Sequence, residues 1–347
     1  MRAMSSLEYA AVVQELQPLL GRRFGRMRRL PGGIYRMKIG DAEIIIEPGI
    51  RLHRTKYMEE TETQDQLAQK ADSELENAKL SSVRQVNDDR IVEFGFEARK
   101  AESGSAKIVF EMFGKGNVVF VENGVALAAM KEESWADREI RKGRAYGYPK
   151  SNNLKTLREA LSDRYVIIAL LKLPLGKEYA QEILSRCGIP EKTPGTELTA
   201  KQVERIESEI AAVRGAQKPL VFYESGKPVD YGLAPFARYG QSESKPFGSM
   251  NEALDEFYWS AEHEVRNPEL EKLERRLDEQ EKRMADLINE EALHKAHGDY
   301  IYANYEAIER LLKEARAMPL DELEKRLAAL KPKVDKKEKS IEIETDQ

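Results

Sequence analysis

Hydrophobic and polar positions divide the chain into a β-rich first part, a helical middle and a long polar helical segment. Residues 4–20 carry apolar side chains at helical spacing and predict an amphipathic helix that Gly21 ends. Alternating runs at 35–39 and 43–47 predict two strands joined by a turn at Gly40-Asp41. Four further strands are predicted at 90–96, 107–113, 117–122 and 125–130, with a hairpin turn at Asn123-Gly124. The first part is therefore expected to hold antiparallel β-sheet.

Between the two groups of strands, residues 59–79 are polar and carry one thin stripe of apolar side chains. The stripe predicts a helix that lies largely in solvent. Its members are Leu67, Ala71, Leu75 and Ala78.

The composition changes near residues 149–153, which predicts a linker into a helical region. Helical periodicity runs from about 154 to 214 and is broken at Pro174, Gly176 and Gly188. An aromatic passage rich in Gly and Pro follows and is expected to return to the first domain. The predicted fold class is therefore α+β, with domains at 1–153, 154–216, 217–260 and 261–347.

The segment from about 264 predicts a coiled-coil arm, since apolar side chains alternate three and four residues apart among Glu, Lys and Arg. Glu291, His294 and Gly298 interrupt this seam in its middle. Residues 333–347 predict a turn and then a short strand with no partner strand after it. The apolar seam residues are Leu270, Leu273, Leu277, Met284, Leu287, Ile301, Tyr305, Ile308 and Leu312.

The composition excludes several classes of protein. The formal net charge of -5 means that the chain is not basic as a whole, so a nucleic-acid footprint must be local. A single cysteine, Cys187, excludes a disulfide framework, and the four scattered histidines lack the spacing of a metal site. No signal peptide or long apolar run is visible, so we expect a soluble, cytoplasmic protein without a membrane partner.

A basic stretch between residues 20 and 56 is the main candidate for contact with phosphate. Ten basic residues against three acidic ones give it a local charge of +7. Phosphate backbones attract such a surface without regard to base sequence. The alternative is that these side chains pair with the acidic run at 59–76. The basic residues are Arg22, Arg23, Arg26, Arg28, Arg29, Arg36, Lys38, Arg51, Arg54 and Lys56.

Three turns carry further candidate chemistry. Asp89-Arg90 begins a predicted strand, where a carboxylate can orient a guanidinium toward a phosphate, or where the side chains bond their own backbone. Gly114-Lys115-Gly116-Asn117 could bring amides close to a phosphate, or could be an ordinary tight turn. Gly188-Ile189 predicts a helix-hairpin-helix whose turn amides hold a phosphate, or a simple helical hairpin.

No nucleophile motif, catalytic triad or kinase motif is visible. Paired carboxylates such as Glu132-Glu133 lie in polar segments that would not raise a carboxyl pKa. Catalysis and a bound cofactor are therefore not expected.

Taken in order, the motifs resemble those of the NFACT family, the ribosome quality control proteins called NEMF in animals and RqcH in bacteria, also labelled fibronectin-binding protein A-like. The resemblance covers nearly the whole chain, and its arm motif is similar to that of archaeal members. The motifs are Ser6-Leu7-Glu8-Tyr9 with Glu15-Leu16, Glu47-Pro48-Gly49-Ile50-Arg51-Leu52-His53-Arg54-Thr55, Asp89-Arg90, Gly114-Lys115-Gly116-Asn117, Arg141-Lys142-Gly143 with Tyr146 and Pro149, Tyr179-Ala180 through Gly188-Ile189, Asn251-Glu252-Ala253-Leu254-Asp255-Glu256-Phe257, and His297-Gly298-Asp299-Tyr300-Ile301-Tyr302-Ala303-Asn304.

The resemblance implies an N-terminal domain similar to the first domain of formamidopyrimidine-type DNA glycosylases. A helix-hairpin-helix module, an antiparallel coiled coil and an RNA-binding C-terminal domain would follow. This sequence would hold the first two and the outgoing half of the coil, as a truncated or naturally short form. Its apolar seam would then lack part of its partner, so we expect weak self-association, measurable by light scattering.

The resemblance also implies that the whole protein binds the large ribosomal subunit with stalled peptidyl-tRNA, recruits tRNA, contacts rRNA and supports template-free tailing of the nascent chain. The ribosome would form the peptide bonds, so the protein would be a scaffold and not an enzyme. Glu8, Asp89 and Arg90 match the family's functional positions, although Glu8 stands where an Asp is usual. The candidate RNA contacts outside that trio are the arginines at 22, 23, 26, 28 and 29 together with Arg51, His53, Arg54, Lys115, Asn117 and Arg141.

Two other functions fit parts of the pattern. A DNA glycosylase of similar fold would attack with an N-terminal Pro-Glu, whereas this chain begins Met1-Arg2-Ala3. An adhesion protein, as the bacterial label suggests, would need export, for which no signal is seen. A base-excision assay and surface labelling of intact cells are the respective tests.

Overall fold

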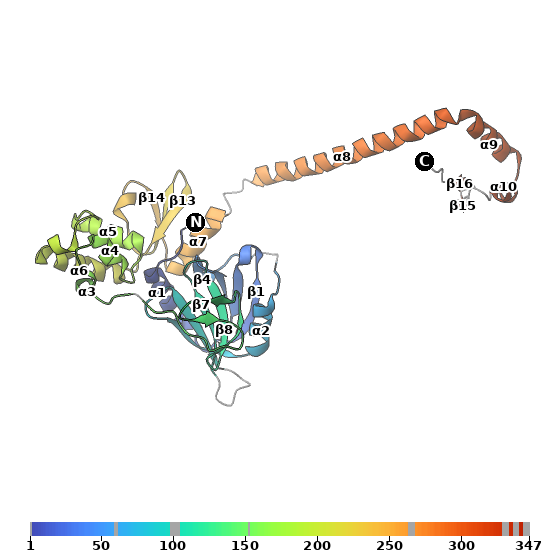
Figure 1. Cartoon of the computed structure of the whole chain (residues 1–347). Helices are drawn as coiled ribbons and strands as arrows, with labels where there is room; N and C mark the ends of the chain where they lie inside the picture. Colours follow the sequence, from blue (N-terminus) through green and yellow to red (C-terminus); the bar gives the residue numbers. More distant parts are fainter. Residues whose placement is uncertain are drawn as a thin grey trace. The chain divides into compact units, whose positions relative to one another are not determined.

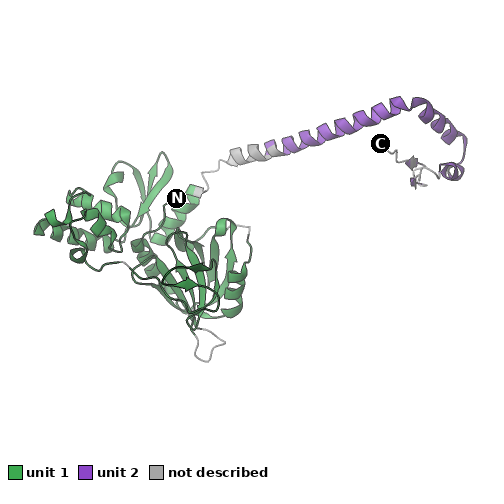
Figure 2. Cartoon of the chain, in the orientation of Figure 1, with its two compact units in different colours: residues 1–265 green, residues 266–347 purple. Residues whose placement is uncertain are grey.

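The computed structural model describes residues 2–58, 62–97, 105–151, 153–262, 268–327, 333–335 and 340–342. The chain forms two compact units, Met1–Val265 and Arg266–Gln347 (Figure 2). All the candidate site residues predicted from the sequence lie in the first unit.

Two antiparallel meanders form the framework of the first unit (Figure 1). The β8–β9 turn at Asn123-Gly124 has φ of 50° and 79°, the left-handed geometry that the predicted hairpin requires. The sequence predicted β2, β3 and β6 to β9, and it missed β1, β4 and β5, whose polar residues obscure the alternation. The four-stranded meander contains β1 (Phe24–Arg29), β2 (Tyr35–Ile39), β3 (Ala42–Glu47) and β4 (Arg51–Thr55), and the five-stranded meander contains β5 (Lys79–Gln85), β6 (Ile91–Glu97), β7 (Ser105–Glu111), β8 (Asn117–Glu122) and β9 (Val125–Ala129).

Helices α1 (Ser6–Glu15) and α2 (Gln66–Glu74) each contact strands of both sheets, so one hydrophobic core joins them. Ser5 and Glu8 cap the start of α1 reciprocally. The prediction of a largely solvated helix at 59–79 was wrong, because α2 is shorter and its apolar stripe is at most 2% exposed. The four predicted apolar residues do share one face, and this face packs against the core.

The outer face of the five-stranded sheet has a small apolar cluster of its own, which includes Val109, Val119 and Ile140. Residues 130–148 cover it and contain two short paired strands, β10 (Glu133–Ser134) and β11 (Glu139–Ile140). The Arg138 guanidinium forms two hydrogen bonds to the Glu111 carboxylate, at 2.7 and 2.9 Å. This segment therefore contributes a buried ion pair as well as apolar contacts.

A helical module follows, made of α3 (Leu157–Ala160), α4 (Val166–Leu171), α5 (Lys177–Cys187) and α6 (Ala200–Arg214). The sequence placed a helical hairpin at Gly188, and this placement was wrong. Gly188, with φ of 67°, does end α5, but α6 begins only at Ala200. The short connection between helices instead spans residues 172–176, between α4 and α5.

The chain then returns to the sheets through residues 217–262. Strands β12 (Leu220–Glu224), β13 (Lys227–Gly232) and β14 (Glu243–Pro246) form a sheet in the order β13-β12-β14, and α7 (Met250–Glu262) packs on β4 and α1. The Glu15 carboxylate accepts hydrogen bonds from the backbone N–H groups of Met250 and Asn251, at 2.6 and 2.9 Å. The described part of the unit also contains the 3₁₀ turns η1 (Gln17–Leu19), η2 (Pro31–Gly33), η3 (Gly195–Glu197) and η4 (Ala237–Tyr239).

The second unit is mostly helical, with α8 (Pro268–Ala303), α9 (Tyr305–Ala317) and α10 (Leu320–Arg326). The helix continues through the polar seam positions Glu291, His294 and Gly298, and it breaks at Asn304. The final strand β16 (Ser340–Glu342) pairs with β15 (Lys333–Asp335), which precedes it. Among the described helices, none combines the length and the apolar composition needed to cross a membrane.

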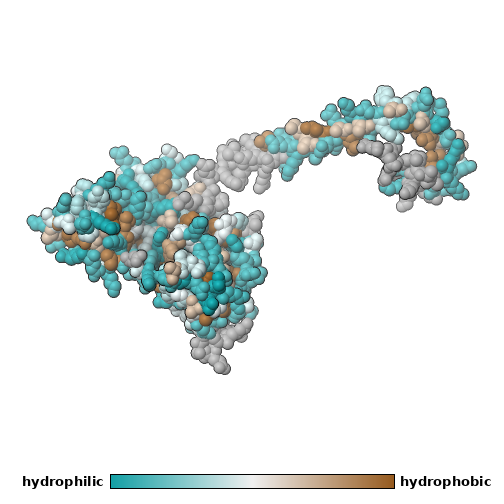
Figure 3. All heavy atoms as spheres, viewed as in Figure 1, coloured by the Kyte–Doolittle hydropathy of each residue, from teal (hydrophilic) through white to brown (hydrophobic). Residues whose placement is uncertain are grey.

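Apolar side chains lie exposed along this second unit (Figure 3). The seam residues Leu277, Met284, Leu287, Ile301, Tyr305 and Leu312 are 48% to 60% exposed. The predicted seam residues Leu270 and Leu273 lie outside the described side chains. A helix with such a stripe is typical of a partner in a coiled coil, and the pairing stays a prediction.

Candidate nucleic-acid interface

Two turns of the sheets meet backbone to backbone beside α1. A Cβ atom at Gly49, in the β3–β4 turn, would lie 2.7 Å from the Gly114 carbonyl oxygen. A Cβ atom at Gly116, in the β7–β8 turn, would lie 2.2 Å from the Gly49 nitrogen. Both glycines have positive φ, 83° and 64°. The glycines around Lys115 therefore allow close packing of two turns, while the Lys115 side chain itself is exposed.

The β5–β6 turn carries Asp89 and Arg90 and is tied to the first turn of α1. The Gln85 side-chain amide donates to the Ser6 and Asp89 carbonyl oxygens, both at 2.8 Å. The Asp89 carboxylate accepts a hydrogen bond from the Arg90 backbone N–H at 2.7 Å, which matches the alternative of a side chain bonding its own backbone. Both side chains are half-buried, so parts of each reach solvent.

A groove of about 780 Å³ adjoins this turn. Its floor is α1, one wall is the β5–β6 turn, and the other comes from the helical module and its connector. Two cationic side chains, Lys155 and Arg214, line it. The lining residues used below are Ser6, Leu7, Ala10, Asn87, Asp88 and Pro174.

Four arginines of the basic stretch pair with the acidic segment, as the alternative interpretation held. Arg28 lies 2.5 Å from Asp72, Arg29 lies 3.2 Å from Asp65, and Arg26 and Arg36 both contact Glu62. Their charges are largely neutralised within the chain. Three candidates, Arg22, Arg23 and Arg54, are exposed. Arg23 donates to the Asn77 carbonyl oxygen at 3.1 Å.

Three other candidates are buried and used structurally. The Asn117 side chain is 1% exposed and joins β8 to the backbone of Lys131. Arg51 is 2% exposed and lies over the Tyr258 ring, 4.4 Å from its centroid. Burial, followed by the Arg51 charge, lowers the pKa of His53 to about 3, so its ring is neutral and offers no cation to a phosphate. Burial leaves these three side chains without a surface for direct contact with RNA.

Arg141 lies at the surface with a weak partner, the Glu132 carboxylate at 3.9 Å, and both side chains are more than half exposed. Lys115 is likewise exposed. Apart from the arginines that pair with the acidic segment, the candidate contacts that reach solvent are Arg22, Arg23, Arg54, Asp89, Arg90, Lys115 and Arg141.

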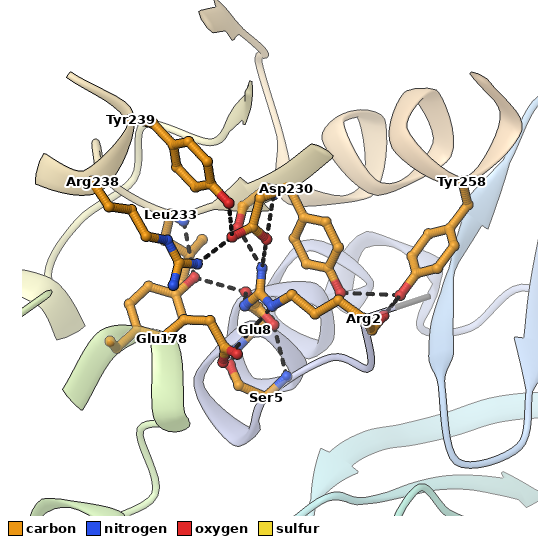
Figure 4. A network of polar contacts seen from close by, with 11 residues as sticks. Arg2, Ser5, Glu8, Glu178, Asp230, Leu233, Arg238, Tyr239 and Tyr258 are labelled. Atoms are coloured by element: carbon orange, nitrogen blue, oxygen red, sulfur yellow. Dashed lines mark hydrogen bonds and ion pairs between the residues drawn. The ribbon is translucent and has the colours of Figure 1, made fainter. Parts of the chain in front are cut away.

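Glu8 of α1 lies in a buried network of polar contacts (Figure 4). Its carboxylate is 0% exposed and accepts hydrogen bonds from Arg2 Nη2 at 2.5 Å, the Ser5 backbone N–H at 2.7 Å and the Tyr179 hydroxyl at 2.9 Å. Burial raises the pKa of Glu8, and the charge of Arg2 opposes this shift. The residue cannot touch a ligand directly in this arrangement.

Sequence reasoning missed the partners of Glu8. Arg2 also reaches Asp230 on β13, and the two residues are 228 positions apart. Tyr179 stood in a motif, but no role was predicted for it. No local spacing connects residues this far apart, so only the fold could bring them together. Among the described residues, no group of three or more His, Cys, Asp or Glu side chains could hold a metal ion.

The comparisons with known proteins agree on one family. The family model described as NFACT N-terminal and middle domains matches residues 7–340. The chain is 26% identical to "Archaeal Rqc2 homolog aRqcH" of Methanocaldococcus jannaschii, over 90% of this chain and 52% of that protein. It is 23% identical to human "Ribosome quality control complex subunit NEMF", over 90% of this chain and 34% of that protein. The chain thus spans about half or less of the length of these relatives.

Two solved structures share the fold. The fibrinogen binding protein from Staphylococcus aureus aligns with a TM-score of 0.59 and 17% identity, covering 73% of this chain and 98% of that one. The N-terminal part of the fibronectin/fibrinogen-binding protein from Streptococcus suis aligns with a TM-score of 0.58 and 18% identity, covering 74% and 100%. At this identity the likeness concerns the fold alone.

Proposed function

Because the chain belongs to the family of NFACT N-terminal and middle domains, we propose that it is a ribosome quality control factor whose first unit binds RNA. The whole protein binds the large ribosomal subunit with stalled peptidyl-tRNA, recruits tRNA and supports template-free tailing of the nascent chain. The ribosome forms the peptide bonds, so this protein acts as a scaffold. The named relatives are ribosome quality control proteins, which supports the general role.

One observation carries the proposal: the turn with Asp89 and Arg90 is held rigidly at the rim of the groove along α1. Two hydrogen bonds from Gln85 fix the turn, and the Lys155 and Arg214 side chains line the same groove. A groove lined by two cationic side chains, beside a turn that carries an arginine, suits a phosphate backbone, because charge-assisted hydrogen bonds to phosphate are strong. Asp89 contributes by accepting a hydrogen bond from the Arg90 backbone N–H, which shapes the turn.

Binding to purified tRNA and to separated large and small ribosomal subunits across a salt series tests the proposal. Wild type is expected to prefer tRNA or the large subunit, with affinity that falls as salt rises. The Asp89→Ala/Arg90→Ala variant is expected to bind about tenfold more weakly.

The chain offers a matched control in Asp163-Arg164, the same dipeptide, exposed on the helical module. Asp163→Ala/Arg164→Ala is expected to bind like wild type. Equal losses in the two double variants would show that general charge and not the turn governs binding. Absence of RNA binding by wild type would overturn the proposal for this part of the protein.

The stripe on α8 and α9 supports contact with another polypeptide segment, and we propose weak self-association through it when that segment is absent. The exposed seam residues would cover one another in a dimer. Light scattering that shows a monodisperse monomer at high protein concentration would contradict this.

The glycosylase alternative is less well supported. Base excision needs an accessible amine and acid at the reacting sugar. Glu8 in α1 is the first acidic residue of the chain. Its carboxylate is fully buried and forms an ion pair with Arg2. Release of a base from damaged DNA by the purified protein would revive the alternative.

A further inference from the structure

The two walls of the groove along α1 come from distant parts of the chain. The β5–β6 turn supplies Asn87 and Asp88, and the helical module supplies Pro174 and Arg214. A second hollow, of about 340 Å³, shares Leu7, Ala10 and Arg214 with the groove and extends it along the same helix. The width of the groove therefore depends on how the module is held against α1.

The module meets α1 through a close contact and a buried hydrogen bond. A Cβ atom at Gly176, where α5 begins, would lie 2.4 Å from the Ser5 Cβ, so the two backbones approach closely there. The Tyr179 hydroxyl on α5 donates to Glu8 at 2.9 Å, and the Tyr179 oxygen accepts a hydrogen bond from the Leu233 backbone N–H at 3.0 Å. The first helix, the module and the returning segment are thus linked at one tyrosine.

Arg2 extends this link to further elements (Figure 4). Its guanidinium contacts Glu8 at 2.5 Å and Asp230 at 2.7 Å, and it lies 3.8 Å from Glu178 on α5. It also sits over the Tyr231 ring, 4.2 Å from the centroid. The Arg2 carbonyl oxygen accepts a hydrogen bond from Tyr258 on α7 at 2.6 Å. One residue therefore touches α1, α5, β13 and α7.

We propose that Arg2 and Glu8 are positioning residues that fix the helical module against the N-terminal sheets and so set the width of the groove. Apolar packing alone lets one element slide on another, whereas a buried, directional ion pair such as Arg2 with Glu8 and Asp230 favours one arrangement. The consequence for RNA affinity rests on the function proposed above. Glu8 then acts on RNA through the module, without touching it.

Distance measurements between spin labels test the positioning role without any RNA. Ser81 on β5 and Ser208 on α6 are exposed, and their replacement by Cys in a Cys187→Ser background allows labelling across the groove. Ser185→Cys with Ser208→Cys labels the module alone and serves as the internal reference. Arg2→Met is expected to broaden or shift the distance distribution across the groove and to leave the reference distance unchanged.

A stability control separates positioning from general weakening. Arg138→Met removes another ion pair, with Glu111, whose side chains are 10% and 3% exposed, on the outer face of the five-stranded sheet. It is expected to lower stability without changing the distance across the groove. If the Arg2→Met variant fails to fold, the Glu8→Gln variant is measured in its place. Glutamine keeps the shape of the Glu8 side chain and removes its charge. Arg2→Lys, which keeps the charge, is expected to restore part of the wild-type distribution.

RNA titration of the same variants tests the consequence. Arg2→Met is expected to weaken tRNA binding about tenfold, and Arg138→Met is expected to bind like wild type. An unchanged distance across the groove in folded Arg2→Met and in Glu8→Gln would overturn the positioning proposal. If wild type binds no RNA, the proposed function fails, while the distances still decide the role of Arg2 and Glu8.

Discussion

Glu8 and Asp89 are two acidic residues that the family resemblance marks as functional, yet they lie in opposite surroundings. The Glu8 carboxylate is 0% exposed and accepts hydrogen bonds from three donors, two in the N-terminal segment and one on α5. Asp89 is only partly buried, and its carboxylate accepts a hydrogen bond from the backbone of its own turn. If the proposed RNA binding holds, the two residues contribute differently: Glu8 through the buried contacts that hold the helical module, and Asp89 through the shape of the turn beside the groove.

The largest effect is expected when the buried region loses its cation. Arg2→Met leaves two carboxylates, those of Glu8 and Asp230, buried with less compensation, and should cost about 3–5 kcal/mol of unfolding free energy. Lys115→Met in the exposed β7–β8 turn should change stability little, because its side chain is in solvent. Urea unfolding of both variants measures the contrast. Similar losses of unfolding free energy in both variants would show that the buried network and the exposed turn contribute equally to stability.

The next effect concerns the close contact between the β3–β4 and β7–β8 turns. Gly116→Ala combines a left-handed φ of 64° with a Cβ only 2.2 Å from the Gly49 nitrogen, and should cost about 2–4 kcal/mol. Gly124→Ala is the matched control: its φ is 79°, but nothing lies within 4 Å of its Cβ, so about 1 kcal/mol is expected. Thermal unfolding compares them. If both variants lose the same stability, the close approach of the two turns at Gly49 and Gly116 does not limit which side chain fits there.

A smaller effect should appear on acidification, through His53. Its pKa in the folded chain is about 3, below the usual 6.5, so the unfolded chain binds more protons between these values. Folding therefore loses stability as the pH falls from 6.5 toward 3, and the loss from this residue is on the order of 2 kcal/mol at pH 5. Arg51 and Asp255 are the charged groups near the ring, at β4 and α7.

Denaturant unfolding at pH 7 and pH 5 measures this loss. In His53→Gln the difference between the two pH values should shrink, since glutamine does not titrate. A difference of the same size in the variant would assign the acid sensitivity to other residues. Because the raised pKa of Glu8 acts in the opposite direction, an acid-stabilised variant would point to that carboxylate.

The parts of the fold and of the candidate site that could be predicted from the sequence are those whose interacting residues lie close together in the chain. Turns depend on residues that are neighbours in the sequence, so the hairpin at Asn123-Gly124 and the position of Asp89-Arg90 at the start of a strand were correctly predicted. Strand β1 was missed because its arginines hide the alternation. Arg28 in that strand is neutralised by Asp72, which lies 44 positions away.

The buried network lay beyond local prediction for the same reason. Glu8 was named from the resemblance, but its partner Tyr179 is 171 positions away and comes from another part of the first unit. Sequence patterns show which side chains are polar, and they do not show which polar side chains will be buried together. The helical hairpin was misplaced at Gly188 because a glycine that ends a helix looks the same whether or not another helix follows at once.

The smallest effect on stability, and a sharp test of which surface charges contact RNA, comes from single exposed or paired cations. If the proposed RNA binding holds, Lys115→Ala should reduce the slope of log affinity against log salt by about 0.7–0.9, the share of one phosphate contact. Arg28→Ala removes a charge of the same sign that Asp72 already neutralises at 2.5 Å, so the slope should stay as in wild type. Filter binding to tRNA at several salt concentrations measures both slopes. If both variants reduce the slope equally, the ion pair between Arg28 and Asp72 opens when RNA binds. The basic stretch at residues 20–56 would then belong to the interface.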